Sequence, residues 1–208
     1  MSSPICFVVL IFLTVVRLIS HAAPFPFFEP IQPPRPFQVI AHHGQSRQAP
    51  ENTRPALQHC IDDGLEWAEV DVRLTLDGQH ILSHDATVTN ASGESWLIQD
   101  HSMEELRRID VGSNFAARFA GEKLLSLQDC FALCKGHLNL YLDCKSVNPE
   151  QLAAEILAAK MERQVVVYSN LDQLAKIRKS SGAKVATMTK WRTSFGGPEW
   201  AVTNGLSA

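Results

Sequence analysis

The sequence lacks three features, and each absence narrows the classes of protein to which the chain can belong. Acidic and basic residues nearly balance, with 19 Lys and Arg against 22 Asp and Glu, so we expect no broad basic surface and no nucleic-acid partner. No Cys-x-x-Cys motif is present, which argues against a zinc site. The apolar run from Cys6 to Val16 is only about half of the roughly 20 residues that a membrane-spanning helix needs.

The N-terminus has the pattern of a secretory signal peptide, which we assign to residues 1–23. Its apolar segment is followed by Arg17 and then by small residues near Ala22 and Ala23, as at a signal-peptidase site. Because no Lys or Arg precedes the apolar segment, an uncleaved membrane anchor is the alternative. We therefore expect a secreted or periplasmic protein, or one that this segment anchors to a membrane.

Residues 24–36 form a second segment that is rich in proline and phenylalanine. Pro24 to Phe37 contains six prolines and four phenylalanines, a composition that excludes a helix and indicates an extended arm or a stiff linker. The aromatic side chains of this arm could contact a membrane surface. The sequence leaves the oligomeric state open.

Four cysteines follow the arm, and their spacing defines no disulfide pairing. A secreted protein can form disulfides, and four thiols allow three pairings. Cys130 and Cys134 stand four residues apart on a predicted helix, and we expect them to pack in the core rather than to bridge or to bind metal.

Residues 37–208 alternate between strand and helix patterns, which predicts a mostly parallel sheet covered by helices. The predicted strands are Phe37–Ala41, Trp67–Thr75, Gln79–Ser83, Leu138–Asp143, Gln164–Tyr168 and Ala183–Thr187, with a possible edge strand at Trp200–Asn204. The predicted helices are Glu51–Asp63, Leu127–Cys134, Pro149–Lys160 and Leu171–Ser180.

The segment from Asp85 to Leu125 interrupts this alternation after the third strand, and Ser102 begins a short capped helix within it. A closed (β/α) barrel typically has eight strands and about 250 residues. The expected fold is therefore a TIM-barrel-like (β/α) domain with an insertion after the third strand. With about six of the eight strands, we expect it to be incomplete and truncated at its C-terminus.

Polar side chains gather where predicted strands end, which is where parallel α/β folds place their active sites. Glu69 and Asp71 are two residues apart and so point to the same face of a strand. Two buried carboxylates side by side are costly without a cation between them. Their oxygen ligands favour Mg²⁺ or Ca²⁺ over zinc, and Asp143 on a nearby strand can complete the coordination.

Two histidines follow the strands that we expect to flank this carboxylate strand, one on either side. They are His42, after the first strand, and His84, after the third. Imidazoles on both sides of a metal are suited to general acid and general base catalysis on a phosphate ester at near-neutral pH.

Five motifs in order give the chain a resemblance to the glycerophosphodiester phosphodiesterase family. They are Ala41-His42-His43-Gly44, Pro50-Glu51-Asn52-Thr53, Glu69-Val70-Asp71-Val72, Thr75-Leu76-Asp77-Gly78 and Ser83-His84-Asp85, and the resemblance covers roughly Phe37 to Thr189. It implies a metal-dependent hydrolase that cleaves glycerophosphodiesters to glycerol 3-phosphate and an alcohol. The segment after Asp85 resembles the characteristic insertion of that family.

The resemblance also implies a role for each site residue. His42 and His84 would be the acid and base, and Glu69, Asp71 and Asp143 would bind the metal. The substrate-binding residues would be His43, Glu51 near the glycerol, and Lys145 near the phosphate.

The chain departs from the family pattern at three points. His43 stands where the family has arginine, and Asp143 is one methylene shorter than the usual glutamate. The last two strand–helix units of the barrel are not recognisable. The alternatives are therefore a lysophospholipid-type phosphodiesterase with the same site, or a weakened or inactive binding protein of the same fold.

Overall fold

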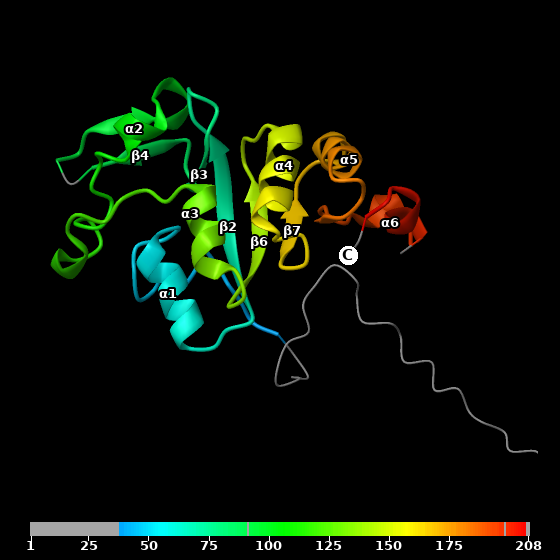
Figure 1. Cartoon of the computed structure of the whole chain (residues 1–208), viewed down its shortest axis with the longest axis horizontal. Coiled ribbons are helices and arrows are strands. Elements are labelled where there is room, and N and C mark those ends of the chain that lie inside the picture. Colours follow the sequence, from blue (N-terminus) through cyan, green and yellow to red (C-terminus); the bar gives the residue numbers. More distant parts are fainter. Residues whose placement is uncertain (1–37, 91, 198, 207–208) are drawn as a thin grey trace, which may run out of the picture.

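The computed structural model describes residues 38–90, 92–197 and 199–206. The predicted signal peptide, 1–23, and the arm, 24–36, lie outside the described residues. The main sheet has six strands in the order β1-β2-β6-β7-β8, with β3 paired to β2 (Figure 1). These strands are β1 (Ile40–Ala41), β2 (Trp67–Leu74), β3 (His80–Leu82), β6 (Asn139–Cys144), β7 (Val165–Tyr168) and β8 (Ala186–Met188).

The longest strand, β2, positions the site because its two faces differ in chemistry. Ala68, Val70 and Val72 are fully buried in the main hydrophobic core. Glu69 and Asp71 alternate with them and point to the opposite face. β2 runs parallel to both β1 and β6, so the ends of these strands meet at one edge of the sheet.

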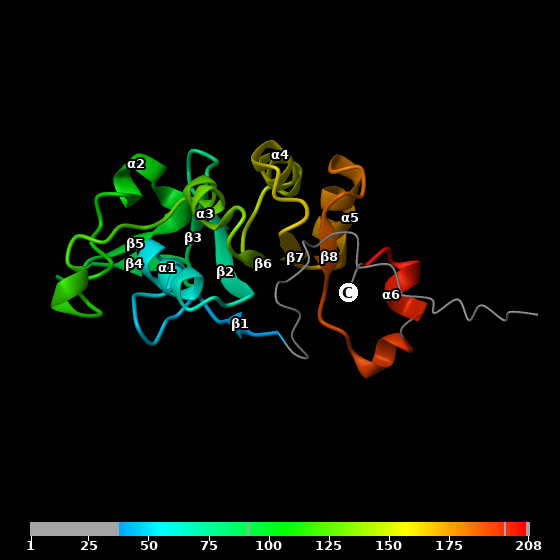
Figure 2. The same cartoon turned by 60° about the horizontal axis from the view of Figure 1, so that its bottom comes forward.

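The main core lies between the sheet and four helices, which cover one face of it (Figure 2). These are α1 (Arg54–Asp62), α3 (Leu127–Cys134), α4 (Pro149–Ala159) and α5 (Leu171–Ser180). All four predicted helices are confirmed, although α1 begins at Arg54 rather than at Glu51. Local signals define the starts of the other three. Ser126, Asn148 and Asn170 each accept a hydrogen bond from the backbone N–H three residues further on, at the N-termini of α3, α4 and α5.

The third strand differs from the prediction in its position relative to β2. β3 pairs antiparallel with β2 through a tight hairpin turn, and Val72 is opposite Leu82 on one side and Cys144 on the other. β3 therefore lies on the same side of β2 as β1. The prediction that the strands carrying His42 and His84 flank β2 on either side is wrong, because β6 pairs with the other edge of β2.

The predicted insertion forms a small layer of its own at one end of the sheet (Figure 1). It contains the hairpin β4 (Thr87–Thr89) and β5 (Ser95–Leu97), the 3-10 helices η1 (Ile98–Asp100) and η2 (Ala117–Phe119), and α2 (Met103–Leu106). A second hydrophobic cluster, which includes Ile81, Val88 and Leu106, holds this layer against β3. The predicted cap at Ser102 is confirmed as a capping box with Glu105.

The C-terminal part of the described chain is helical where we expected a possible edge strand. Residues Trp200–Asn204 overlap α6 (Glu199–Thr203), which follows the 3-10 helix η3 (Thr193–Phe195). The rings of Trp200 and Phe195 stack with their centroids 4.2 Å apart, a contact that packs α6 against η3. None of the helices in the described residues is long and apolar enough to span a membrane.

The described residues therefore form an open, mostly parallel sheet with covering helices, which confirms the prediction of an incomplete TIM-barrel-like fold. All four cysteines in this part of the chain are free thiols. Cys130 and Cys134 are both fully buried in the main core, as expected.

Candidate active site

The connection from β1 to α1 brings its histidines to the sheet edge through a tight turn. His43 and Gly44 have φ angles of 55° and 74°, both in the left-handed region. A Cβ on Gly44 would lie 3.0 Å from the Cβ of Ala56, so both the conformation and the close approach require glycine. The Gly44 N–H donates to the carbonyl of Glu69 at 3.2 Å, which fixes the turn to β2.

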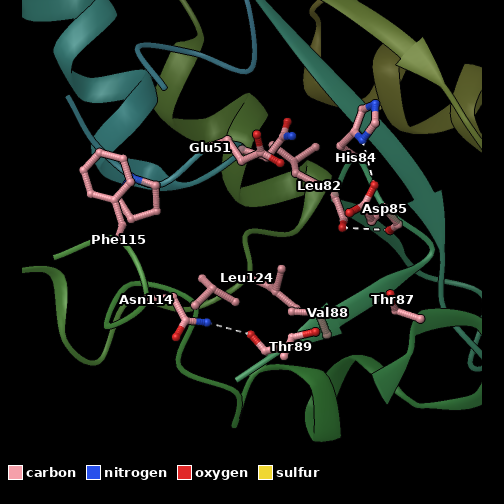
Figure 3. Close-up of a pocket in the computed structure, with 14 residues that line it drawn as sticks. Glu51, Leu82, His84, Asp85, Thr87, Val88, Thr89, Asn114, Phe115 and Leu124 are labelled. Atoms are coloured by element: carbon pink, nitrogen blue, oxygen red, sulfur yellow. Dashed lines mark hydrogen bonds and ion pairs between the residues drawn. The ribbon is translucent and has the colours of Figure 1, made fainter. Parts of the chain in front are cut away.

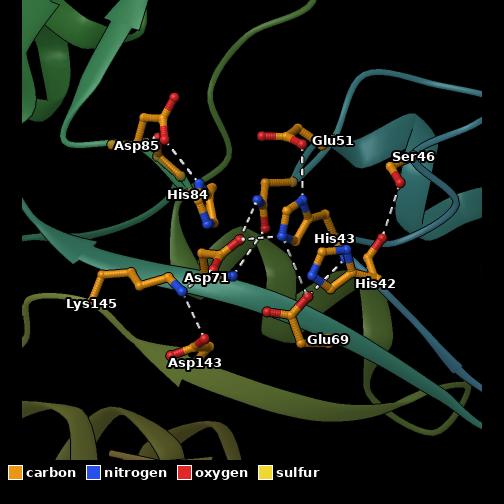
Figure 4. A network of polar contacts seen from close by, with 12 residues as sticks. His42, His43, Ser46, Glu51, Glu69, Asp71, His84, Asp85, Asp143 and Lys145 are labelled. Carbon is orange, nitrogen blue, oxygen red and sulfur yellow. Dashed lines mark hydrogen bonds and ion pairs between the residues drawn. The ribbon is translucent and has the colours of Figure 1, made fainter.

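His43 lies at the centre of the site and is 7% exposed. Its backbone N–H donates to Glu69 Oε2 at 2.8 Å, and its Nδ1 lies 2.8 Å from Glu51 Oε2 (Figure 4). Its Nε2 lies 3.3 Å from Asp71 Oδ2 and has no hydrogen-bond partner among the described residues. Of the two adjacent imidazoles, His43 is therefore the one that contacts the carboxylates on both sides.

His42 lies on the outer side of His43, with the two rings stacked at a centroid distance of 3.7 Å. It is exposed to solvent, and one of its nitrogens lies within 4.8 Å of a Glu69 oxygen. His84, at the end of the β2–β3 hairpin, lies 5.1 Å from the ring of His43. The imidazole next to His84 is thus that of His43, whereas the sequence predicted that His42 would face His84.

His84 is half-exposed, and neighbouring residues bind both its side chain and its backbone carbonyl. Its Nδ1 lies 2.9 Å from Asp85 Oδ1. Its backbone carbonyl accepts two hydrogen bonds from the Arg73 guanidinium, at 3.0 and 2.6 Å. Arg73 is on β2 and was not identified from the sequence, although its position two residues after Asp71 places it on the same face of the strand.

Three carboxylates meet beside the imidazoles. Asp71 on β2 is paired in register with Asp143 on β6, and Glu69 precedes Asp71 by two residues on the same face. One oxygen from each of the three lies within 4.8 Å of the others. The structure thus brings together all three predicted metal ligands.

Among the described residues, Lys145 provides the one ammonium that contacts these carboxylates. Its Nζ lies 2.7 Å from Asp143 Oδ2 and 3.1 Å from Asp71 Oδ1. Burial lowers the pKa of Lys145, but the hydrogen bonds to Asp143 and Asp71 outweigh it and hold the pKa above its ordinary value. Burial raises the pKa of Glu69, because the hydrogen bond from the His43 N–H offsets only part of the desolvation.

Asn52 is a second residue of the site that was not identified from the sequence. Its Nδ2 donates to Asp71 Oδ2 at 2.8 Å, and its Oδ1 accepts from the Asp71 N–H at 3.0 Å. Its own N–H donates to the His43 carbonyl at 3.0 Å. Its φ angle of 57° allows this geometry, and asparagine tolerates such a conformation better than most residues. Its position between Glu51 and Thr53, in one of the five motifs of the family resemblance, is the sequence feature that could have identified it.

The residues present fit a hard divalent cation. Carboxylate oxygens are the ligands that Mg²⁺ and Ca²⁺ prefer. Asp71 is fully buried, and three carboxylates face a single ammonium, so the cluster lacks positive charge. A buried cluster with an excess of negative charge is stabilised by a cation.

A cavity of about 310 Å³ opens beside the site, between the Glu51 loop, the end of β3 and the insertion (Figure 3). His84 and Glu51 form its border with the site, and Val88, Phe115 and Leu124 form its apolar wall. A separate cavity of about 350 Å³ lies at the carboxylates and is lined by Ile40, His42, Glu69, Tyr141 and Asp143.

Comparison with protein families agrees with this geometry. The model of the glycerophosphoryl diester phosphodiesterase family matches residues 42–193. A glycerophosphodiester phosphodiesterase of Caldanaerobacter subterraneus is 38% identical over 95 residues, which cover 46% of this chain and 39% of the relative. Human glycerophosphodiester phosphodiesterase 1 is 33% identical over 130 residues, which cover 57% of this chain and 39% of the relative. The chain thus spans about two fifths of the length of these two relatives.

Solved structures share the fold. A glycerophosphodiester phosphodiesterase from Agrobacterium tumefaciens superposes with a TM-score of 0.73 at 22% identity, covering 81% of this chain and 73% of that one. An Oleispira antarctica phosphodiesterase in complex with the product sn-glycerol-3-phosphate superposes with a TM-score of 0.67 at 26% identity, covering 82% of this chain and 72% of that one.

Proposed function

Since the chain belongs to the glycerophosphoryl diester phosphodiesterase family, we propose that it hydrolyses glycerophosphodiesters to glycerol 3-phosphate and an alcohol. The observation that carries the proposal is the convergence of Glu69, Asp71 and Asp143, on the parallel strands β2 and β6, beside the imidazoles of His42, His43 and His84. The glycerol 3-phosphate bound in the Oleispira antarctica relative supports the assignment of the product.

Glu69, Asp71 and Asp143 would hold a divalent cation, Mg²⁺ or Ca²⁺. When bound, such an ion supplies electrostatic stabilisation to the phosphate oxygens as charge develops on them. Asn52 orients Asp71 through two hydrogen bonds, and Lys145 places a fixed positive charge beside Asp143.

His42 and His84 are assigned the proton transfers because both rings reach solvent, where a substrate can approach them. In the overall hydrolysis, water forms the new P–O bond, the P–O bond to the alcohol breaks, and the alcohol oxygen takes up a proton. One imidazole accepts the proton from water and the other donates one to the leaving oxygen.

His43 is assigned to phosphate binding and positioning rather than to proton transfer. It is buried, and Glu51 holds its Nδ1. With Nδ1 held by Glu51, His43 leaves only Nε2 to contact a phosphate, whereas the arginine of the family would provide a two-pronged contact. His43→Arg is therefore expected to lower KM, and His43→Ala to raise it, with a smaller effect on kcat than His84→Ala.

The experiment is an assay of glycerol 3-phosphate release from a glycerophosphodiester in the presence of Mg²⁺ or Ca²⁺. His84→Ala is expected to lower kcat by about 10²–10⁴-fold, the range for loss of a general acid or base. The matched control is His137→Ala, which removes an exposed imidazole from the turn after α3. Equal activity of His84→Ala and His137→Ala would remove the catalytic assignment of His84.

A non-catalytic protein that binds phosphate compounds is the second candidate, because His43 replaces an arginine of the family pattern. Isothermal titration separates the two candidates when combined with the assay. One-to-one metal binding with no release of glycerol 3-phosphate would favour the binding protein.

A further inference from the structure

A second set of potential metal ligands lies beside the three carboxylates and contains two imidazoles. His43, Asp71 and His84 each place one ligand atom within 4.8 Å of the other two. The side chain of His43 is only 9% exposed, and its Nε2 has no hydrogen-bond partner among the described residues. This buried nitrogen lies 3.3 Å from Asp71 Oδ2 (Figure 4). The set thus surrounds a buried nitrogen whose hydrogen-bonding capacity is not used within the described chain.

A carboxylate holds each of the two imidazoles through the opposite ring nitrogen. His43 Nδ1 lies 2.8 Å from Glu51 Oε2, and His84 Nδ1 lies 2.9 Å from Asp85 Oδ1. Because an ionised carboxylate only accepts hydrogen bonds, each Nδ1 carries the proton, and in a neutral ring the Nε2 lone pair is then available. Figure 4 shows the second nitrogen of His84 pointing toward Asp71. Metal-binding histidines are typically fixed in this way by a carboxylate on the other nitrogen.

Asp71 Oδ2 has the spacing of a third ligand. Lys145 contacts the other oxygen, Oδ1, at 3.1 Å, and Asn52 donates to Oδ2 at 2.8 Å. A carboxylate oxygen has a second lone pair, so Oδ2 can also bind an ion. Two ligand atoms of a tetrahedral zinc ion, each at its usual bond length, lie about 3.3–3.5 Å apart. The 3.3 Å between His43 Nε2 and Asp71 Oδ2 agrees with this separation.

The ligand types distinguish this set from the three carboxylates. Imidazole nitrogen suits Zn²⁺, whereas Mg²⁺ and Ca²⁺ prefer oxygen ligands. Zinc is commonly held by three protein ligands with a fourth position open, and the lack of a Cys-x-x-Cys motif does not bear on a set without cysteine. His42, His43 and Glu69 form an alternative set, but the rings of His42 and His43 are stacked. The in-plane lone pairs of stacked rings run side by side instead of converging on one ion.

We propose that His43, Asp71 and His84 bind a zinc ion, and that this ion inhibits the hydrolysis. With zinc bound, the Nε2 lone pair of each histidine is occupied, so His43 cannot contact the phosphate and His84 cannot transfer a proton. Arginine is a poor metal ligand because it stays protonated, so the site depends on the histidine at position 43. Zinc binding is independent of the proposed function, whereas the inhibition rests on it.

The binding test is a titration of the purified protein with Zn²⁺ in competition with a colorimetric chelator. Excess Mg²⁺ is present to compete for the carboxylate set. We expect one zinc ion per protein molecule. His43→Arg and His84→Ala each remove a ligand and should lower the affinity about 100-fold or more, because even the partners of metal ligands contribute about 10–100-fold. Glu51→Gln weakens such a partner and should lower the affinity about tenfold or more.

Two other histidine variants are the controls, and circular dichroism checks the folding of every variant. His137→Ala removes an exposed imidazole from the turn after α3, and His42→Ala removes the ring that stacks on His43. Both should keep the wild-type affinity for zinc. If His43→Arg fails to fold, His84→Ala tests the same site from a half-exposed position.

Three results would overturn the site. They are a wild-type protein that binds no zinc, a folded His43→Arg or His84→Ala variant with the wild-type affinity, and a loss of affinity in His42→Ala as large as that in His84→Ala.

Release of glycerol 3-phosphate in excess Mg²⁺ tests the inhibition. A zinc concentration that saturates the site should inhibit the wild-type protein, whereas His43→Arg should keep its activity at that concentration. Equal inhibition of both proteins would mean that zinc acts at another place, and it would overturn the inhibitory role. If the wild-type protein releases no glycerol 3-phosphate even without zinc, the proposed function fails, and the titration still tests the zinc site.

Discussion

Substitution of Asn52 tests how the site is built, because its side chain makes hydrogen bonds to Asp71, whose carboxylate is fully buried. Asn52→Ala removes the donor to Asp71 Oδ2 and the acceptor for the Asp71 N–H. A hydrogen bond to a charged group contributes about 1.5–3 kcal/mol and a neutral one about 1 kcal/mol. The left-handed backbone at φ 57° costs alanine about 1–2 kcal/mol more.

These contributions predict that Asn52→Ala lowers the free energy of unfolding by about 3.5–6 kcal/mol at neutral pH. Asn52→Gly loses the same hydrogen bonds but tolerates the backbone conformation, so it should be less destabilised than Asn52→Ala by about 1 kcal/mol. Urea denaturation in the presence of a chelator measures both values without a contribution from bound metal.

The same variants should also weaken metal binding. Residues that orient a metal ligand typically contribute about 10–100-fold to affinity. If Asn52→Ala and Asn52→Gly unfolded at the wild-type urea concentration, the two hydrogen bonds to Asp71 would not be formed in solution. Equal destabilisation of Asn52→Ala and Asn52→Gly would contradict the left-handed backbone conformation of residue 52.

Further predictions concern residues outside the carboxylate cluster. Burial alone would raise the pKa of Glu155, but hydrogen bonds from His80 and Gln151 outweigh it and lower that pKa below its ordinary value of 4.5. The contribution of ionised Glu155 and these two partners to the free energy of unfolding is therefore present above pH 4.5 and is lost as the pH falls through the lower folded-state pKa. Glu155→Gln should remove this loss, so that the free energy of unfolding measured by urea denaturation falls less steeply at acid pH. Gly44→Ala should destabilise the protein by about 1–3 kcal/mol, because the new methyl group would contact Ala56 and the φ of residue 44 is positive. An unchanged midpoint of thermal unfolding would contradict this turn conformation. Burial raises the pKa of Cys60 to about 11, so its thiol should react with iodoacetamide at neutral pH only as fast as the protein unfolds, and rapid labelling of the folded protein would refute its burial.

The sequence predicted most of the fold because its helices begin and end with strong local signals. Leu127–Cys134 and Leu171–Ser180 are observed with the predicted bounds, each preceded by a capping residue. The hairpin β4–β5 was missed because three-residue strands are too short to show alternation. The side of β2 on which β3 lies was wrong because the residues of a strand do not specify which edge of a neighbouring strand it pairs with.

Within the site, the sequence predicted which residues come together but not how they contact one another. Glu69 and Asp71 share a face because the side-chain period of a strand is two, and that follows from spacing alone. The contact of Asn52 with Asp71 depends on a left-handed backbone conformation that spacing does not encode. The inward position of His43 likewise follows from its own positive φ and the turn at Gly44.

The most direct measurement of the central claim is metal-dependent release of glycerol 3-phosphate by the purified protein. After removal of metals with a chelator, the protein should release no glycerol 3-phosphate from a glycerophosphodiester, and addition of Mg²⁺ or Ca²⁺ should restore the activity. Glu69→Gln, checked for folding by circular dichroism, should stay inactive at the same metal concentration. Full activity of the metal-free protein, or of Glu69→Gln, would contradict the account.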